Sequence, residues 1–195
     1  MGETKNPTPL CAVIGTKGAG KAWSDEVSED AFRVGRLVVE AGFDLVTGGM
    51  GGVMSVSAEG CRSVGGRCIG LLPGEDHTKA NPHLTNVMPT GIGLARNSLT
   101  ALAGSAVIAL PGGRGTLEEI SFALDYLRPV MAWPYWAWLH DAPDGLFGSV
   151  QFSSWKGCRP NRRHLDWDRV RYFLEDVHSE LRESCLLYTS PSPRD

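Results

Sequence analysis

Short apolar runs recur along the chain, and each is followed by glycine, proline or polar residues. The first of them, Leu10-Cys-Ala-Val-Ile14, ends at Gly15. Runs of this length, bounded by turn residues, are typical of strands buried in a parallel sheet. Such runs predict strands at 10–14, 43–47, 67–72, 86–88, 106–110 and 128–132.

The stretches between these runs carry apolar residues three and four positions apart, which predicts amphipathic helices. The clearest example begins at Ser24 or Asp25, where a polar cap precedes an acidic first turn, and it ends at Gly42. Its inward stripe comprises Val27, Ala31, Val34, Val38 and Ala41. Further helices are predicted over about 53–63, up to 103, from about 117 to 127, and over 166–183.

The predicted elements alternate between strand and helix. This order is typical of an α/β protein with a Rossmann-like, doubly wound, mainly parallel sheet, helices on both faces and right-handed crossovers. A length of 195 residues suits a single such domain, which we place at 10–184. Residues 1–9 are a polar tail that we expect to be flexible. Residues 185–195 are rich in proline and serine, and we expect a disordered, non-native tail there.

Composition narrows the class of function. The formal net charge of −3 gives no basis for a nucleic-acid groove or for attraction to an anionic membrane. No apolar run approaches the roughly 18 residues of a membrane span. Five cysteines without a CxxC pair favour reduced thiols in the cytoplasm over a disulfide framework. His77 and His83 lack the spacing of a usual zinc site, so we predict no metal site.

The stretch from Ala106 to Glu119 reads as a buried strand, a glycine turn and a helix. Between the apolar run and the helical stripe lie Pro111, Gly112, Gly113, Gly115 and Thr116. In this arrangement, backbone N–H groups and the positive end of the helix dipole point at one spot, which suits a phosphate. Glycines permit a ligand to approach closely, and we expect this turn to use positive φ. The Thr116 hydroxyl has two compatible roles, as a phosphate donor or as a helix cap.

Two more glycine-rich turns follow strands, so we expect all three to line one cleft at the carboxyl edge of the sheet. Gly15 to Lys21 fits the first positions of a P-loop, but Ala22 stands where the Mg²⁺-binding hydroxyl is required. The dinucleotide fingerprint also fails, because its third glycine is missing. We interpret this segment as a general cleft loop. The turn Gly48-Gly-Met-Gly-Gly52 either binds an anion or permits tight helix-to-sheet packing, and the sequence favours neither.

Three blocks of the chain resemble the LOG ("Lonely guy") family, often labelled lysine-decarboxylase-like. Pro111 to Glu119 matches the PGGxGTxxE motif, Thr47 to Met54 is similar to the family's GGGxxGxM turn, and Thr90 to Asn97 reads TGxGxARN. The similarity covers about residues 10–132. The resemblance implies a Rossmann-like nucleotide-binding fold, a small phosphorylated ligand, and a homodimer or homotetramer.

Two branches of this superfamily are open. LOG-type enzymes hydrolyse the N-glycosidic bond of nucleoside 5′-monophosphates, and their motif arginine and glutamate fall on Arg96 and Glu119. Molybdenum-cofactor carrier proteins and their relatives carry the TGxGxARN block, which is present here nearly letter for letter. LOG enzymes usually have a lysine after the arginine, where this chain has Asn97. We therefore favour binding of a pterin-type cofactor, with molybdopterin as the candidate ligand, or of a nucleotide.

The resemblance and the glycine turns together give one set of candidate site residues. Arg96 suits a bidentate phosphate contact in either branch, and its alternative is an ion pair with Glu118 or Glu119 that orders two loops. In a hydrolase, Glu119 would assist the attack of water while Arg96 stabilised the ribose phosphate or the departing base. The predicted ligand-binding residues are Gly15, Gly48, Gly49, Gly51, Gly52, Thr90, Gly91, Arg96, Asn97, Pro111, Gly112, Gly113, Gly115, Thr116 and Glu119.

The sequence bears on two other classes of function. A decarboxylase that uses pyridoxal phosphate is disfavoured, since no lysine is placed in a strand–turn cleft with an acid for the pyridine nitrogen. Five of the six tryptophans fall between 133 and 167. They fill a second small core, cover the sheet edge or form a partner surface, and we favour the core. A partner-binding module that uses this segment is the third class.

Overall fold

The computed structural model describes residues 7–18, 20–133 and 167–189, and these form one parallel sheet flanked by helices. The strands are β1 (Leu10–Ile14), β2 (Asp44–Thr47), β3 (Cys68–Leu72), β4 (Asn86–Pro89), β5 (Ala106–Ala109) and β6 (Val130–Ala132). The α-helices are α1 (Asp25–Glu40), α2 (Val53–Ser63), α3 (Arg96–Ala103), α4 (Arg114–Asp125) and α5 (Trp167–Thr189). Short 3₁₀ turns η1 (His77–Lys79) and η2 (Gly93–Ala95) precede β4 and α3.

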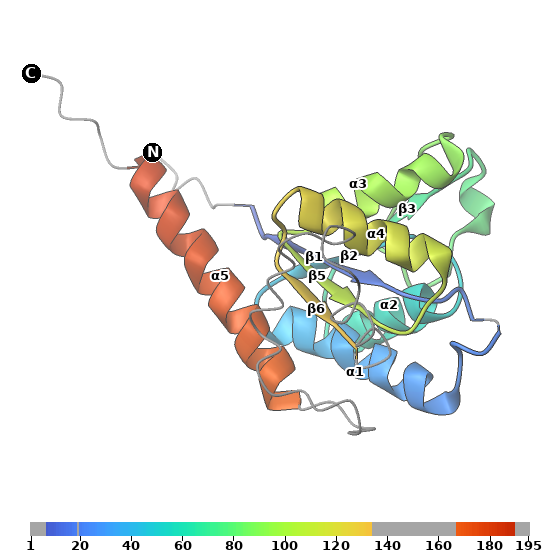
Figure 1. Ribbon diagram of the computed structural model, residues 1–195, viewed down its shortest axis with the longest axis horizontal. Coiled ribbons are helices and arrows are strands. Elements are labelled where there is room, and N and C mark those ends of the chain that lie inside the picture. The colour runs from blue at the N-terminus through green and yellow to red at the C-terminus, as the bar shows by residue number, and fades with distance from the viewer. Residues whose placement is uncertain (1–6, 19, 134–166, 190–195) are drawn as a thin grey trace, which may run out of the picture.

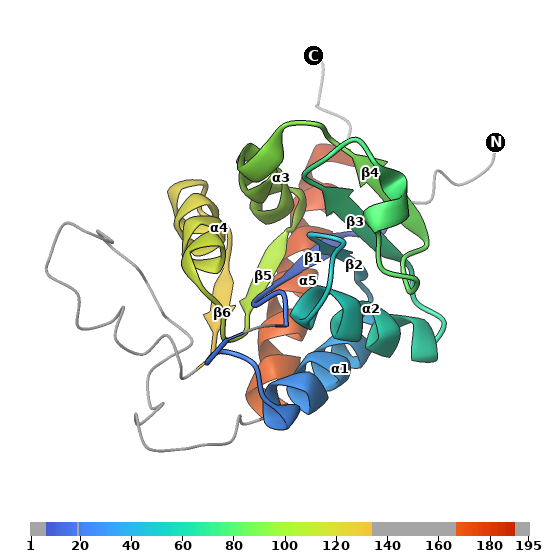
Figure 2. The same ribbon diagram turned by 90° about the vertical axis from the view of Figure 1, so that its right-hand side faces the viewer.

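The six strands lie in the order β4-β3-β2-β1-β5-β6, and every neighbouring pair is parallel. Helices α1 and α2 pack together on one face of the sheet, and α3 and α4 pack together on the other (Figures 1 and 2). Helix α5 contacts α1, and the two views place it on the far side of the molecule from the loop that follows β1. The predicted doubly wound α/β fold is confirmed.

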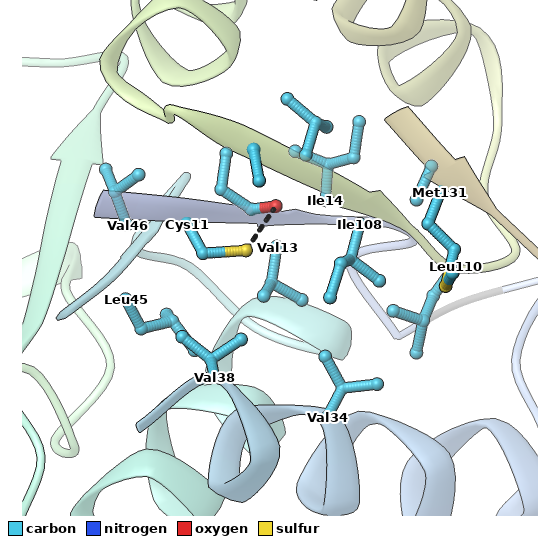
Figure 3. Packing of buried hydrophobic residues seen from close by; sticks show 14 of the residues in the cluster. Cys11, Val13, Ile14, Val34, Val38, Leu45, Val46, Ile108, Leu110 and Met131 are labelled. Carbon is cyan, nitrogen blue, oxygen red and sulfur yellow. Dashed lines mark hydrogen bonds between the residues drawn. The ribbon is translucent and has the colours of Figure 1, made fainter. Parts of the chain in front are cut away.

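The core lies on the central strands. Side chains of Cys11 to Ile14 on β1 and of 106–109 on β5 are at most 1% exposed, because helices cover both faces of these strands. Figure 3 shows Val34 and Val38 of α1 below the sheet, beneath Val13 and Ile108. Uninterrupted apolar runs are therefore buried on both sides, which explains why these strands show no alternation of polar and apolar residues.

Helix α1 follows the sequence pattern closely. The side chain of Ser24 caps it by accepting a hydrogen bond from the Val27 N–H at 3.3 Å. The stripe residues Val27, Ala31, Val34 and Val38 are buried as predicted. Gly42, just past the end, has φ +87°, a conformation that side chains rarely adopt.

Glycines let α1 and α2 approach each other at backbone distance. A Cβ on Gly60 would lie 2.0 Å from the carbonyl oxygen of Phe32, and one on Gly35 would lie 2.0 Å from that of Ser57. Each helix therefore presents a glycine to the backbone of the other. This close crossing fixes where α2 begins, and hence where the loop between β2 and α2 lies.

We expect Gly60→Ala to destabilise the protein, although alanine is the better helix former. The new methyl group would push the helices apart, and overpacking of this kind costs about 1–3 kcal/mol in the free energy of unfolding. Urea denaturation measures it, with Glu59→Ala on the exposed side of α2 as the control. An unchanged or raised stability for Gly60→Ala would contradict the described crossing.

The last helix differs from the prediction at its end. Helix α5 runs to Thr189, past residue 185, where we placed the start of the disordered tail. No proline or glycine occurs between Trp167 and Pro191, so the sequence holds no residue of the kind that usually ends a helix before this point. Residues 1–6, 19, 134–166 and 190–195 lie outside the described residues, so the predictions for the end of the chain and for most of the tryptophan-rich segment fall there. Among the described helices, none is long and apolar enough to cross a membrane.

Candidate functional site

The sheet changes its direction of growth at β1. Because β1 lies between β2 and β5, the chain moves outward to β4 on one side and later to β6 on the other. Ligands of open α/β sheets bind outside the carboxyl ends of the strands at such a point. Two backbone hydrogen bonds join the loops here: the Thr16 N–H donates to Pro111 O and the Val53 N–H to Thr16 O, both at 2.9 Å. The predicted gathering of the three glycine turns is confirmed.

Among the described residues, nothing covers the amino terminus of α4. Gly113 is its N-cap and no side chain caps it, while the first bond inside the helix runs from the Leu117 N–H to Gly113 O at 3.1 Å. The N–H groups of residues 113–116 therefore have no partner within the helix. A Cβ built on Gly113 would meet no atom of the described chain within 4 Å. In the described structure, open space, backbone donors without a partner and the positive end of the helix dipole coincide here, and together they suit a phosphate.

Gly112 is required for a different reason from the one that the sequence suggested. Its φ is not positive, and Gly113 has φ −110°, so the predicted left-handed turn is wrong. A Cβ on Gly112 would instead lie 2.1 Å from the Thr116 hydroxyl, whose residue is 3% exposed. Thr116 belongs to the first turn of α4 and is not its cap. The glycine thus makes room for the threonine side chain beneath the turn.

Arg96 is buried at the start of α3, where it faces α4. Its Nη1 lies 3.7 Å from Glu119 Oε1 and donates to the Thr100 hydroxyl at 3.2 Å. A Cβ on Gly48 would lie 2.2 Å from the same Nη1, so the glycine after β2 leaves room for the guanidinium. The Nε atom is buried without a hydrogen-bond partner among the described residues. Of the two predicted ion-pair partners, Glu119 is the one that Arg96 approaches.

Glu119 is only 6% exposed, and this burial changes the pKa of its carboxyl group. Burial raises the pKa of Glu119 to about 8; Arg96 opposes this shift and Glu118 adds to it. Burial also lowers the pKa of Arg96, but a guanidinium stays protonated at any pH of interest. Below pH 8 the pair therefore carries the arginine charge with a largely protonated carboxyl.

Asn97 turns toward the other glutamate. Its Nδ2 donates to Glu118 Oε2 at 3.0 Å, and the residue is 4% exposed. A Cβ on Gly115 would lie 3.4 Å from the same Nδ2, so the amide rests against the first turn of α4. The TGxGxARN block thus sends two consecutive side chains, of Arg96 and Asn97, to two consecutive acids.

The turn 48–52 is explained by packing. Gly52 has φ +63°, and a Cβ there would lie 2.4 Å from Thr16 O and 2.2 Å from the Gly18 N. Since Thr16 O also accepts a hydrogen bond from the Val53 N–H, the loop that follows β1 covers the start of α2. Gly49 likewise has positive φ and packs against Gly70. Of the two open interpretations, tight packing accounts for these glycines, and the α2 terminus is closed by the chain itself.

The remaining predicted residues are spread over this edge of the sheet. A Cβ on Gly15 would lie 2.8 Å from Val53, and one on Gly51 would lie 3.3 Å from Lys17 O. The Thr90 hydroxyl donates to Leu72 O at 2.7 Å, at the outer strand pair β3–β4. The Gly91 N–H donates to Gly74 O at 3.3 Å. The bonds of Thr90 and Gly91 therefore serve the sheet edge, away from the Arg96–Glu119 pair.

The P-loop is excluded by geometry as well as by sequence. In a P-loop the GK[ST] residues open the helix that follows the strand. Here α1 begins at Asp25, so Lys21 and Ala22 precede it in a separate turn. The described residues also contain no group of three or more His, Cys, Asp or Glu side chains that could hold a metal ion.

The family is settled by comparison with known proteins. A family model described as the SLOG cluster4 family matches residues 10–144, more than half of the chain. The chain belongs to the SLOG cluster4 family. The resemblance found from the three sequence blocks is therefore confirmed.

Curated relatives of this SLOG protein include LOG enzymes. An uncharacterized protein of Archaeoglobus fulgidus is 40% identical over 57% of this chain and 72% of its own length. A cytokinin riboside 5′-monophosphate phosphoribohydrolase of Rhodococcoides fascians is 31% identical, over 86% of this chain and 80% of its own. A probable enzyme of the same kind from rice, LOGL5, is 33% identical over 70% of this chain; the match spans only 52% of the rice protein.

Solved structures add the second branch. The molybdenum cofactor binding protein of Rippkaea orientalis superposes with a TM-score of 0.60 at 31% identity, over 66% of this chain and 77% of the other. The molybdenum cofactor carrier protein of Chlamydomonas reinhardtii gives 0.60 at 29%, over 65% and 76%. The SLOG protein is thus similar to both an enzyme branch and a carrier branch.

Some residues of the site were missed by the sequence analysis. Thr100 holds the Arg96 guanidinium from one turn further along α3, and the four-residue spacing was the available signal. The contact of Thr16 with Pro111 joins two loops far apart in the chain. This contact could not be predicted from a local sequence pattern, because it depends on β1 and β5 being neighbours in the sheet.

Proposed function

We propose that this SLOG protein binds a small phosphorylated ligand, either a pterin cofactor of the molybdopterin type or a nucleotide. The phosphate would lie at the amino terminus of α4, against the N–H groups of residues 113–116. The observation that carries the proposal is that, within the part of the chain that the structure describes, this terminus has no side-chain cap and has open space at Gly113. The start of α2, in contrast, is covered by the chain. A mononucleotide and a molybdopterin both offer the phosphate that this terminus suits.

The neighbouring charges support an anionic ligand. Arg96 is buried against Glu119 of α4, and its Nε has no hydrogen-bond partner among the described residues. Glu119 itself is largely protonated below pH 8. The local charge is then positive when a phosphate arrives. Arg96 would act from its buried position, through the field it adds at the turn, and would contact the ligand only after leaving Glu119.

Of the two functions known in the superfamily, cofactor carrier and phosphoribohydrolase, Asn97 favours the carrier. In this chain the residue after Arg96 is an amide bound to Glu118, so the extra cation expected of LOG enzymes is absent. The two solved structures named for the molybdenum cofactor share the fold at about 30% identity. A carried cofactor would be released intact, so no group in the site needs to move a proton.

The second candidate is a phosphoribohydrolase that acts on nucleoside 5′-monophosphates, the class of activity for which the Rhodococcoides fascians and rice relatives are named. The observation that favours it is the raised pKa of Glu119. A carboxyl that keeps its proton near neutral pH suits a general acid, which would protonate the departing base. Assisting the attack of water, the role that the resemblance implies, needs an ionised carboxylate, and a raised pKa suits that role less well.

Native mass spectrometry of the purified protein tests the proposal, and an adenine-release assay with AMP separates its two forms. We expect a co-purified ligand whose mass contains phosphate, and no sustained release of adenine. Steady multiple-turnover release would select the hydrolase. Protein that carries no ligand and gains none from AMP, guanosine monophosphate or a molybdopterin preparation would contradict the proposal.

A further inference from the structure

The contact between Asn97 and Glu118 is a second polar link between α3 and α4, beside the Arg96–Glu119 ion pair. The Asn97 amide donates to the carboxylate at 3.0 Å and rests against Gly115. Asn97 is 4% exposed and Glu118 is half-buried, so the bond is partly shielded from water. An amide and a carboxylate held in this way fix where one negative charge lies beside the phosphate turn.

Glu118 has an alternative partner on its own helix. Arg114 is the first residue of α4 and is exposed, and it precedes Glu118 by one turn. Side chains at this spacing reach each other and form ion pairs. In the described part of the chain, Arg114 makes no ion pair, and Glu118 is turned to α3 instead. The cation at the open terminus is therefore left available to an anion.

We propose that Asn97 is a positioning residue that holds the Glu118 carboxylate on α3 and so keeps Arg114 available at the phosphate turn. The inference rests on the proposed phosphate site and concerns what sets its affinity. Without the Asn97 amide, Glu118 turns to Arg114, cancels its charge, and brings a carboxylate toward the bound phosphate. Asn97 thus acts through Glu118 and need not touch the ligand.

The consequence is a conditional effect. Asn97→Ala should weaken phosphate binding about tenfold, the size expected for one charge moved by a few ångströms near the surface. The loss should depend on the acid at 118. Glu118→Gln keeps the hydrogen-bond acceptor and removes the charge, so adding it to Asn97→Ala should restore the affinity. A residue that merely braced α3 against α4 would not be rescued in this way.

The test is a titration of the parent, the two single variants and the double variant with inorganic phosphate, followed by the amide resonances of residues 112–116 at pH 6.5. We expect dissociation constants that rise about tenfold for Asn97→Ala and return to within about twofold of Glu118→Gln in the double variant. Thermal unfolding of each protein checks folding, and Asn97→Ser replaces Asn97→Ala if the latter unfolds.

Each outcome decides one part of the account. An Asn97 variant that binds as the parent does, or a double variant as weak as the single one, overturns the positioning role while the phosphate site stands. A parent whose resonances at 112–116 do not respond to phosphate removes the proposed function itself. Rescue together with a stronger salt dependence in the double variant than in Asn97→Ala supports the inference, because one more cation is then free.

Discussion

Gly113→Val should abolish binding of phosphorylated ligands while leaving the protein folded. The backbone at Gly113 is extended, with φ −110° and ψ −154°, so it does not have the positive φ that favours glycine, and no described atom lies within 4 Å of its Cβ position. Valine would therefore fit the chain and occupy the volume where the phosphate is expected. Calorimetric titration with AMP measures the effect, and we expect a loss of affinity of a hundredfold or more, equal to about 3 kcal/mol.

Gly74→Val is the matched control. Gly74 is also exposed, has no positive φ, and has no atom within 4 Å of its Cβ position, but it lies after β3 at the outer part of the sheet. The control should bind as the parent does, and both variants should keep the far-UV circular dichroism of the parent. Equal binding by Gly113→Val and Gly74→Val would place the ligand somewhere other than the α4 terminus.

Glu119→Gln should make the stability of the protein less sensitive to pH. Burial raises the folded-state pKa of Glu119 from 4.5 to about 8, so its contribution is fully present below pH 4.5 and is lost as the pH rises through 8. Glutamine has no such titration. The free energy of unfolding of the parent, relative to the variant, should fall by up to about 1.4 kcal/mol per pH unit between pH 5 and 8.

Urea denaturation at pH 5, 6, 7 and 8 gives this difference directly, with Glu118→Gln as the control because Glu118 is less buried. A constant difference between parent and Glu119→Gln would show that the buried carboxyl titrates normally.

The same variant separates the two functions. Loss of a general acid should cost about a hundredfold or more in turnover, whereas a carrier should keep its affinity.

The sheet and its helices were predictable because their signals are local. Residues 11–14 and 106–110 are buried, and each of these stretches is a run of adjacent apolar residues that can be recognised in the sequence. The α1 stripe and its Ser24 cap lie within a few turns of each other. Because strands and helices alternate, the strands are parallel and the glycine turns that follow them lie at one edge of the sheet. This placement needs no knowledge of any side-chain contact.

The contacts inside the site were less predictable because they join distant parts of the chain. Gly112 was correctly placed in the turn, but its reason is the Thr116 side chain and not a left-handed backbone. Gly48 was assigned to the ligand, and the structure places the Arg96 guanidinium there. Sequence reasoning identifies where glycine is needed, while the atom that requires the space becomes known only from the fold.

The roles of the two acids show the same limit. The sequence placed Glu118 and Glu119 side by side at a helix start, where either could pair with Arg96. Their separation depends on the α3–α4 packing, which turns Arg96 to Glu119 and Asn97 to Glu118. The protonation of Glu119 follows from burial at this interface, a quantity that neighbouring residues in sequence do not set.

A crystal structure of the protein soaked with AMP tests the central claim most directly. The account predicts phosphoryl oxygens within hydrogen-bonding distance of the backbone N–H groups of residues 113–116, with the start of α2 still covered by Thr16. A phosphate bound instead at the loop 15–21 or at the start of α2, with the α4 terminus left to water, would contradict it.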